Sequence, residues 1–509
     1  MNLDLPTLIT FVIYIIGMLI FGVIFYRTTT NLSDYVLGGR KLNSWVTALS
    51  AGASDMSAFM ILGLPGAVYL SGMSELWLPV GLTIGAYLNW QFLAKRLRRY
   101  TEIAGNAITL PDFLEKRFYD NTTAMHTKIL RIVSAFFILL FFTFYTSSGL
   151  VGGALLFSST FGWEYQTALW IGAIVIISYT FLGGFLAVSY TDFIQGVIMF
   201  LGLIIVPIVA VMELGGWNDT VSAISEVDPV YLDAFAGTSA IAIISLLAWG
   251  LGYFGQPHII TRFMAIRSEK EIPAARAIGM TWMTFGLLGA IFVGFIGIAY
   301  FGGAGPGSAL ADEETVYIFF TQILFNPLVA GILLAAILAA IMSTIDSQLL
   351  VSSSALTEDF YRGLLKPTAS SRELVWVGRF GVVGIALIAT FLAMDPESTV
   401  LELVEYAWAG FGAAFGPVML FSVFWRRMTA WGAIAGIITG GLTVIVWNFF
   451  EGGLFDLYEL LPGFIFGSLA IIIVSLLNQR PADRILDEFD FVDNAKYDEE
   501  NKMYVRKDS

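Results

Sequence analysis

The chain has 509 residues and carries 40 acidic against 27 basic side chains, a formal net charge of −13 at pH 7. It is 57% hydrophobic and only 13% charged, with a mean hydropathy of +0.77, whereas soluble domains usually carry about 25% charged residues. This balance excludes an ordinary soluble domain and indicates a polytopic membrane protein. With no cysteine and two histidines, disulfides, thiol chemistry and a histidine-rich metal site are excluded as well.

Apolar stretches long enough to cross a bilayer recur along the whole chain. Lipid offers the backbone no hydrogen-bond partner, and the short alternating segments of a β-barrel are absent, so we expect an all-α fold. Thirteen spans are predicted, at residues 6–26, 45–70, 74–94, 129–158, 165–187, 191–213, 238–257, 276–301, 327–355, 373–394, 399–425, 429–449 and 457–478.

The positions of lysine and arginine predict the orientation. All 27 are assigned to alternate loops and the C-terminal tail, whereas the opposite loops at 213–238 and 301–320 hold acids and no basic residue. Because basic loops stay inside, we expect the N-terminus outside and the C-terminus inside. The polar tail, 478–509, is expected to be mostly solvated, and we see no appended catalytic domain.

Two spans are interrupted by polar and helix-breaking residues. The second contains SAGASDMSAFM, residues 50–60, which places Asp55 in an otherwise apolar run. The seventh contains WGLGYFGQPH, residues 249–258, where glycines and a proline break the helix. Two interruptions five spans apart indicate an inverted repeat of five plus five helices, with the binding site at the breaks.

The ninth span presents oxygen atoms on one face. Ala340, Ser343, Thr344 and Ser347 recur at helical spacing in AAIMSTIDS, next to Asp346. Hydroxyls in membrane helices often bond to their own backbone, but this cluster favours a cation site, because hard cations prefer oxygen ligands. Asp192, which starts the sixth span, is either a buried functional acid or a helix cap.

Eight short stretches spread along the chain stand out: YVLGGRKL (35–42), TALSAGASDMS (47–57), GLPGAVYLSG (63–72), GFLAVSYTD (184–192), WGLGYFGQPHI (249–259), GILLAAILAAIMST (331–344), ELVWVGR (373–379) and AWAGFGAAFGP (407–417). In them the chain resembles the sodium/solute symporter family, and within it the proline-transporting branch. The resemblance implies a LeuT-type five-plus-five repeat with one extra N-terminal and two extra C-terminal helices. We expect an N-terminal extra span with its loop at 1–44, a first repeat at 45–213 and a second repeat at 214–425. Two C-terminal spans at 426–478 and a cytoplasmic tail at 479–509 would follow.

The resemblance also implies roles for individual residues. The sodium site would combine Asp55, the critical carboxylate, with the carbonyls of Ala53, Met56 and Ala340 and the hydroxyls of Ser343 and Thr344. The substrate side would comprise Ser57, Ala58, Tyr145, Trp249, Tyr253, Gln256 and Pro257. Ion coupling, or a second cation site, would involve Arg40, Asp192, Asp346 and Ser347.

We therefore expect a sodium-coupled L-proline carrier of the bacterial cytoplasmic membrane, with neither an organic cofactor, a nucleic-acid partner nor an obligatory protein partner. Two departures from the proline branch concern the site. Ala58 and Phe59 stand where Gly-Trp is usual, which would trim the substrate pocket, and Asp346 replaces a residue that is neutral in some relatives.

Alternative functions remain open at this point. Another small solute (an amino or carboxylic acid, a vitamin or a sugar) or proton coupling would suit the same pattern. A solute sensor would need an output domain, and the tail is short. A channel would not need two broken helices, and an enzyme is disfavoured because no nucleophile–base or metal constellation stands out.

Overall fold

The computed structural model describes residues 5–26, 32–120, 123–303, 310–498 and 503–506, and these are mostly helical. Ten of its helical stretches are long and apolar enough to cross a membrane, or eleven if the bent pair Ala240–Gly255 and Pro257–Ala265 is one span. One stretch, Ala58–Ile103, covers parts of two predicted spans, and Tyr165–Phe181 is shorter than the rest. The chain is a multi-pass membrane protein, and the count of thirteen spans stays a prediction.

Every predicted span coincides with a helix or with a helix broken by a turn. The first half of the chain forms α1 (Leu5–Tyr26), α2 (Leu32–Leu37), α3 (Ser44–Met56), α4 (Gly63–Ser71), α5 (Trp77–Leu88), α6 (Ala94–Ile103), α7 (Leu110–Arg117), α8 (Ala124–Phe161), α9 (Tyr165–Leu182) and α10 (Phe185–Glu213). The second half forms α11 (Trp217–Val227), α12 (Ala240–Ala248), α13 (Pro257–Ala265), α14 (Ile272–Phe301), α15 (Val316–Leu324), α16 (Pro327–Ser354), α17 (Ser371–Leu392), α18 (Val400–Phe424), α19 (Ala430–Trp447), α20 (Leu460–Leu477), α21 (Asp483–Asn494) and the antiparallel strands β1 (Ala495–Asp498) and β2 (Met503–Arg506). Short 3₁₀ segments include η2 (Ala58–Met60), η6 (Trp249–Gly255), η8 (Glu313–Thr315) and η10 (Gly453–Asp456).

The predicted boundary between the fifth and sixth spans is wrong by several residues. α9 ends at Leu182 and α10 begins at Phe185, where the hydropathy pattern predicted 187 and 191. Gly183 and Gly184 form the joint in extended conformation. Apolar residues lie on both sides of this short joint, so hydropathy alone does not locate it.

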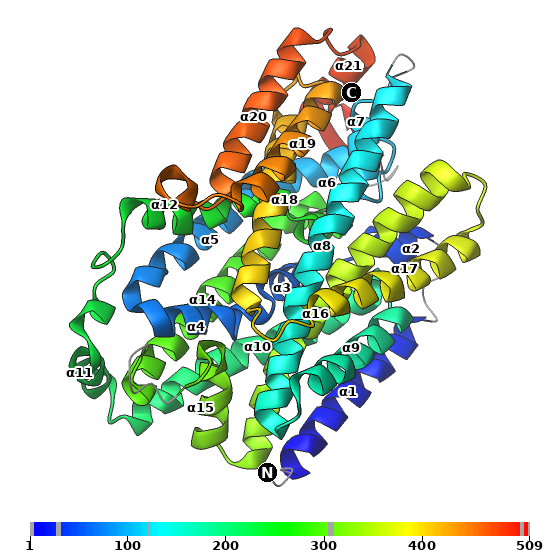
Figure 1. Ribbon diagram of the computed structural model, residues 1–509. Helices are drawn as coiled ribbons and strands as arrows, with labels where there is room; N and C mark the ends of the chain where they lie inside the picture. Colours follow the sequence, from blue (N-terminus) through cyan, green and yellow to red (C-terminus); the bar gives the residue numbers. More distant parts are fainter. Residues whose placement is uncertain (1–4, 27–31, 121–122, 304–309, 499–502, 507–509) are drawn as a thin grey trace.

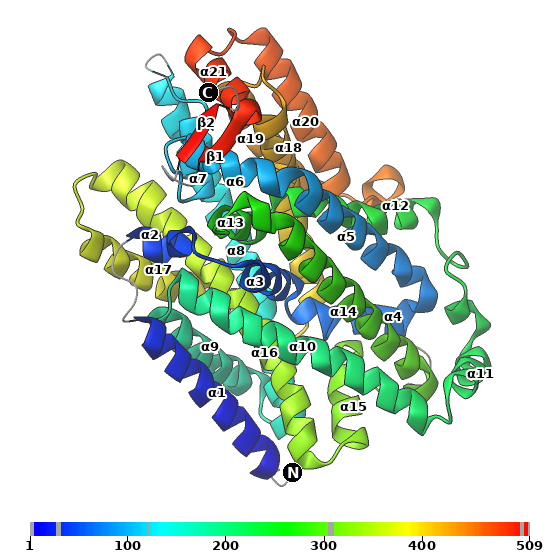
Figure 2. The ribbon, with the colours of Figure 1, turned by 180° about the vertical axis from the view of Figure 1, so that it is seen from behind.

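The two interrupted helices lie at the centre of the molecule. In Figures 1 and 2, α3 is surrounded by other helices, and it packs against α10, α13, α14 and α16. The other interrupted helix, α12–η6–α13, packs through η6 against α5 and α18. The two breaks are therefore shielded by whole helices, as a site in the membrane interior requires.

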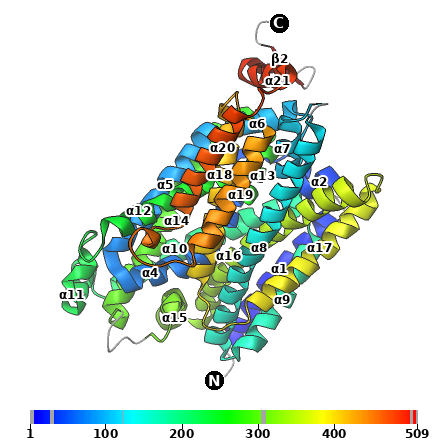
Figure 3. The ribbon, with the colours of Figure 1, turned by 45° about the horizontal axis from the view of Figure 1, so that its top comes forward.

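The start of α1 and the C-terminal helix α21 lie at opposite ends of the molecule (Figure 1). Figure 3 shows α6 and α7, which belong to a basic segment, at the same end as α21, whereas α11 from an acidic loop lies away from them. This separation agrees with an odd number of crossings and with the alternation of basic and acidic loops.

The C-terminal tail is folded against the body of the protein, which corrects the expectation of a solvated extension. Helix α21 buries one apolar face, formed by Ile485, Leu486, Phe489 and Val492. Phe489 packs edge-on against Tyr100 of α6 with ring centroids 6.3 Å apart. The composition of the tail does not predict this apolar face, because acidic residues dominate it. Residues 499–502 and 507–509 lie outside the described part of the chain.

At the opposite end, the buried side chain of Glu314 in η8 caps helix α18. Its carboxylate oxygens accept the backbone N–H groups of Val400 at 2.9 Å and Leu401 at 3.0 Å. Burial raises the pKa of Glu314 from 4.5 to about 7, although the two N–H groups favour the charged form. The segment before α15 is thereby attached to the first turn of α18.

We expect the burial of the Glu314 carboxyl group to make folding stability fall as pH rises. Between pH 4.5 and about 7 the folded chain keeps a proton that the unfolded chain releases, a difference worth roughly 3 kcal/mol across that window. Glu314→Gln should remove this part of the pH dependence, as measured by thermal unfolding between pH 4.5 and 8. The control is Glu313→Gln, which alters a less buried neighbour. Parallel pH profiles of wild type and Glu314→Gln would contradict the prediction.

Candidate functional site

The break in the second span is a real interruption of the helix. α3 ends at Met56, and Ser57 adopts φ +48°, a left-handed conformation that is costly for a residue with a side chain. The Ser57 hydroxyl accepts the N–H of Phe59 at 3.1 Å, which helps to hold the turn. Because α3 stops inside the protein, the carbonyls of its last turn lack helical partners.

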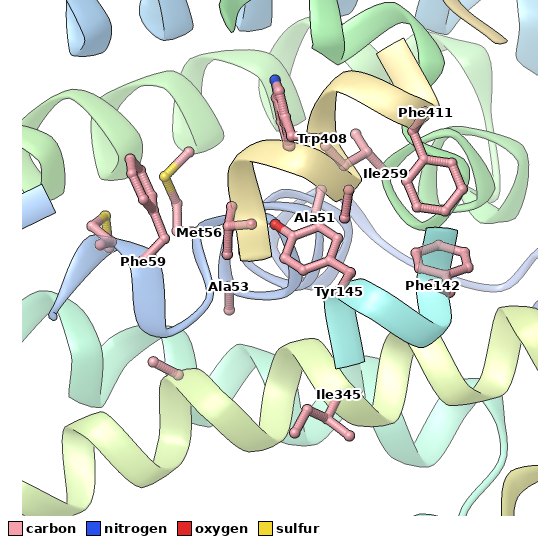
Figure 4. Packing of buried hydrophobic residues seen from close by; sticks show 14 of the residues in the cluster. Ala51, Ala53, Met56, Phe59, Phe142, Tyr145, Ile259, Ile345, Trp408 and Phe411 are labelled. Carbon is pink, nitrogen blue, oxygen red and sulfur yellow. The ribbon is translucent and has the colours of Figure 1, made fainter. Parts of the chain in front are cut away.

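Those carbonyls meet the hydroxyl face of the ninth span. Ser343 donates to the carbonyl of Ala53 at 2.9 Å and to that of Ala340 at 3.1 Å, and Thr344 donates to Ala53 at 3.3 Å. All four residues are buried. Figure 4 shows Ala53 and Met56 along α3, with α16 passing beside them. Oxygen atoms almost 300 residues apart in sequence thus converge at one place.

The carboxylate of Asp55 faces the other broken helix. Its Oδ2 accepts the hydroxyl of Tyr253 at 2.7 Å, and its backbone carbonyl accepts the hydroxyl of Tyr145 at 3.1 Å. Its Oδ1 is buried and accepts no hydrogen bond from the described residues. Asp55 therefore joins α3 to η6 and α8, and it retains one oxygen that can receive a further partner.

The seventh span is broken as its glycines and proline predicted. η6 continues α12, Gln256 is extended, and Pro257 opens α13 at a bend of 44°. A methyl group on Gly250 would lie 2.2 Å from a backbone oxygen of α5, so only glycine permits this approach. The amide of Gln256 donates to the carbonyls of Gly252 at 3.2 Å and Trp408 at 3.3 Å, which holds the break in place.

A small cavity lies between the two breaks. Its free volume is about 10 Å³, room for about one water molecule. It is lined by Asp55, Met56, Phe59, Leu82, Tyr145, Trp249, Tyr253, Val404 and Trp408. Three of the predicted substrate residues, Tyr145, Trp249 and Tyr253, belong to this lining. The structure therefore shows a closed conformation that has no room for a solute.

The other predicted substrate residues lie next to this lining. Ser57 forms the turn, and Gln256 and Pro257 shape the second break. Ala58 is completely buried, and a methyl group on Gly152 of α8 would lie 3.1 Å from its Cβ. The methyl group that distinguishes Ala58 from glycine thus packs toward α8.

A buried ion pair on α13 was missed by the sequence interpretation. Arg262 is fully buried and contacts Asp192 of α10 at 3.0 Å, Ser50 of α3 at 3.0 Å and Ser347 of α16. Ser50 also donates to Asp192 at 2.7 Å. One guanidinium group therefore connects four helices.

Arg262 was assigned to an inner loop because the seventh span was predicted to end at residue 257. α13 in fact continues that span to Ala265 beyond the break. The available signal was the apolar run HIITRFMA, which continues past Pro257 and contains one cation. A lone charge in such a run marks a functional or paired residue.

The four predicted coupling residues fall into two groups. Asp192 and Ser347 lie in the Arg262 cluster, and Asp346 is close enough for its charge to act on Asp192 and Arg262. Neither carboxylate oxygen of Asp346 accepts a hydrogen bond with good geometry from the described residues. Arg40 lies apart, where it donates to the carbonyl of Ala107 at 2.8 Å and also to the end of α13.

Two broken helices that meet at a buried carboxylate, beside backbone carbonyls that accept hydroxyls from a third helix, are typical of a secondary transporter. A sequence model of the sodium:solute symporter family matches residues 35–440. The chain belongs to this family. Membership points to transport of a solute together with sodium rather than to catalysis.

Relatives cover nearly the whole chain. The "Sodium/proline symporter" of Escherichia coli strain K12 is 55% identical over 96% of both chains. The "High-affinity proline transporter PutP" of Bacillus subtilis strain 168 is 54% identical over 93% of this chain and 98% of its own.

The solved structure of a Na⁺-coupled sialic acid symporter, in a substrate-bound outward-open state, has the same fold, with a TM-score of 0.78 at 20% identity. It covers 94% of this chain and 99% of its own. Mhp1, a nucleobase-cation-symport-1 family transporter in a closed conformation, is more distant, with a TM-score of 0.54 at 13% identity over 89% and 98% of the two chains. The predicted LeuT-type fold is confirmed.

Proposed function

We propose that this chain carries out sodium-coupled uptake of L-proline by alternating access across the bacterial cytoplasmic membrane, with its N-terminus outside and its C-terminus inside. The relatives named as proline carriers support the solute. The convergence of Ser343 and Thr344 on the carbonyl of Ala53 is the observation that carries the sodium coupling. The division into repeats 45–213 and 214–425 is part of this proposal.

Sodium would bind as cargo between α3 and α16. The hydroxyls of Ser343 and Thr344 now donate to the Ala53 carbonyl. If these hydroxyls rotate, their oxygens face the same point as the Ala53 and Ala340 carbonyls, and Met56 supplies a further carbonyl from the end of α3. Such a set suits a hard cation. The positive charge would also compensate the nearby buried carboxylate of Asp55.

Proline would bind in the cavity between the two breaks. Its carboxylate would meet backbone N–H groups that the broken helices leave free, and its ring would pack on Trp249 and Tyr253 once Phe59 moves away. Binding of sodium and proline is reciprocal, so each should tighten the other equally. A potential of ~100 mV contributes roughly 2.3 kcal/mol per sodium ion and a tenfold gradient about 1.4 kcal/mol, enough for several-hundred-fold accumulation.

Asp192, Asp346 and Ser347 are candidates for a second cation site. In the closed conformation the guanidinium of Arg262 takes the place of that cation beside Asp192. A second sodium ion and the Arg262 contact would therefore exclude one another. Arg40 would act separately, through its contacts with α6 and the end of α13.

Uptake of labelled L-proline into proteoliposomes, with and without an inward sodium gradient, tests the proposed function. We expect uptake that depends on sodium and that unlabelled proline suppresses more strongly than other amino acids, carboxylic acids, vitamins or sugars. If proline neither enters nor competes, the assigned solute is wrong. Uptake that persists without sodium and follows a pH gradient would indicate proton coupling.

Ser343→Ala and Thr344→Ala should raise the sodium concentration for half-maximal uptake by roughly tenfold or more, because each removes an oxygen that meets a charge. The proline concentration for half-maximal uptake at saturating sodium should change much less. Ser353→Ala is the matched control, since that hydroxyl bonds within its own helix at 3.0 Å. Equal shifts in the sodium and proline requirements would contradict this assignment.

A further inference from the structure

Trp249, the proposed proline contact, is held within a stack of aromatic rings. Phe59 lies on it at a centroid distance of 5.6 Å and an interplanar angle of 20°. Tyr458 lies on it at 5.2 Å and 23°. The indole N–H of Trp408 also donates to the backbone carbonyl of Trp249 at 2.8 Å. Figure 4 shows Phe59 and Trp408 near the α3 break.

Trp408 also stacks on Trp249, at 6.4 Å and 25°. The other two stacked rings, Phe59 and Tyr458, differ in their position relative to the cavity. Phe59 lines the central cavity together with Trp249, whereas Tyr458 does not belong to that lining. A solute ring that packs on Trp249 must therefore take the place of Phe59. Tyr458 supports the indole from outside the cavity and is not displaced by the solute.

Tyr458 comes from the linker between α19 and α20, which lies outside the five-plus-five repeat. Its hydroxyl donates to the carbonyl of Glu405 in α18 at 2.8 Å, and its backbone N–H donates to the hydroxyl of Ser245 in α12 at 3.0 Å. The side chain is only 4% exposed. A large ring with both ends fixed is a rigid support for the indole that lies on it.

We propose that Tyr458 is a positioning residue for proline: it fixes the orientation in which Trp249 receives the solute ring. The C-terminal helix pair α19 and α20 thereby contributes to solute affinity without touching the solute. This inference rests on the proposed role of Trp249. An aromatic pair of this kind is worth about 0.5–1.5 kcal/mol beyond its buried area, which sets the size of the expected effect.

The test is a double-mutant cycle with Trp249→Ala and Tyr458→Ala in proteoliposomes. Tyr458→Ala should raise the KM for proline about two- to tenfold, with the maximal rate and the sodium requirement close to wild type. Tyr458→Phe keeps the ring but loses the hydrogen bond to Glu405, so it should raise the KM for proline less than Tyr458→Ala does. The KM of the double variant for proline should be no higher than that of Trp249→Ala alone, because Tyr458 then has no indole ring to position.

Tyr406→Ala is the matched control, since that ring on α18 packs against Phe141 and Phe144 instead. Additive effects of Trp249→Ala and Tyr458→Ala, or a fall in the maximal rate alone, would overturn the inference and leave the proposed function intact. An unchanged KM in Trp249→Ala would instead refute the proposed proline site. If Tyr458→Ala does not accumulate, Tyr458→Leu keeps apolar volume without a ring and enters the same cycle.

Discussion

We expect Asp55→Ala to abolish sodium-dependent proline uptake while the protein still inserts into the membrane. This is the largest effect that we expect on transport. The carboxylate is 5% exposed, one oxygen is bound to Tyr253, and the other has no hydrogen-bond partner among the described residues. Its negative charge lies two residues from the Ala53 carbonyl in the same last turn of α3. Removing the charge removes the field that favours a cation there.

Three further variants test whether the charge of Asp55, rather than its size or its hydrogen bond, is required. Asp55→Asn keeps the size and an oxygen for Tyr253 but not the charge, and should fail nearly as completely as Asp55→Ala. Tyr253→Phe removes only the hydrogen bond and should retain sodium-dependent uptake at reduced affinity. Glu226→Ala, on the exposed surface of α11, should behave as wild type. Sodium binding of normal affinity by purified Asp55→Ala would refute the central assignment.

We expect Arg262→Met to lower the stability of the folded protein by about 3–5 kcal/mol, because it leaves Asp192 buried without its cation. Both side chains are completely inaccessible to solvent and lie 3.0 Å apart. Helices α3, α10 and α16 lose their common contact with α13 at once. The thermal unfolding midpoint of the purified protein should fall strongly, and the amount of protein in the membrane should fall with it.

The matched control is Arg426→Met, which removes an arginine from an exposed pair with Asp490 and should leave the midpoint unchanged. Adding Asp192→Asn to Arg262→Met should recover part of the lost stability, since no unpaired charge then remains at that position. If Arg262→Met unfolds at the same temperature as wild type, the guanidinium does not compensate the buried acid. If Asp192→Asn gives no recovery, Asp346 is the acid that needs Arg262.

The composition of the C-terminal tail did not predict its structure. Acidic residues make up much of α21, so its average character is polar, yet Ile485, Leu486, Phe489 and Val492 share one buried face. That face is buried because Tyr100 and other residues of α6 lie opposite it. Amphipathic spacing was available in the sequence, whereas the partner surface was not.

The sequence by itself determined the membrane class, both broken helices and the hydroxyl face of the ninth span. These features are local: apolar length, glycine and proline at the breaks, and serine and threonine at helical spacing all act within about one helix. The convergence of Ser343 and Thr344 on Ala53 was implied by resemblance to a family, and the described geometry agrees with it.

Only the tertiary structure decided what surrounds the central residues. Arg262 was assigned to a loop, yet it is buried because α3, α10, α13 and α16 meet at its guanidinium. Tyr458 lies more than 200 residues from Trp249 and stacks on it because η6 packs against α20 and α18. Burial and stacking depend on which helices become neighbours, and no periodicity within one helix records that choice.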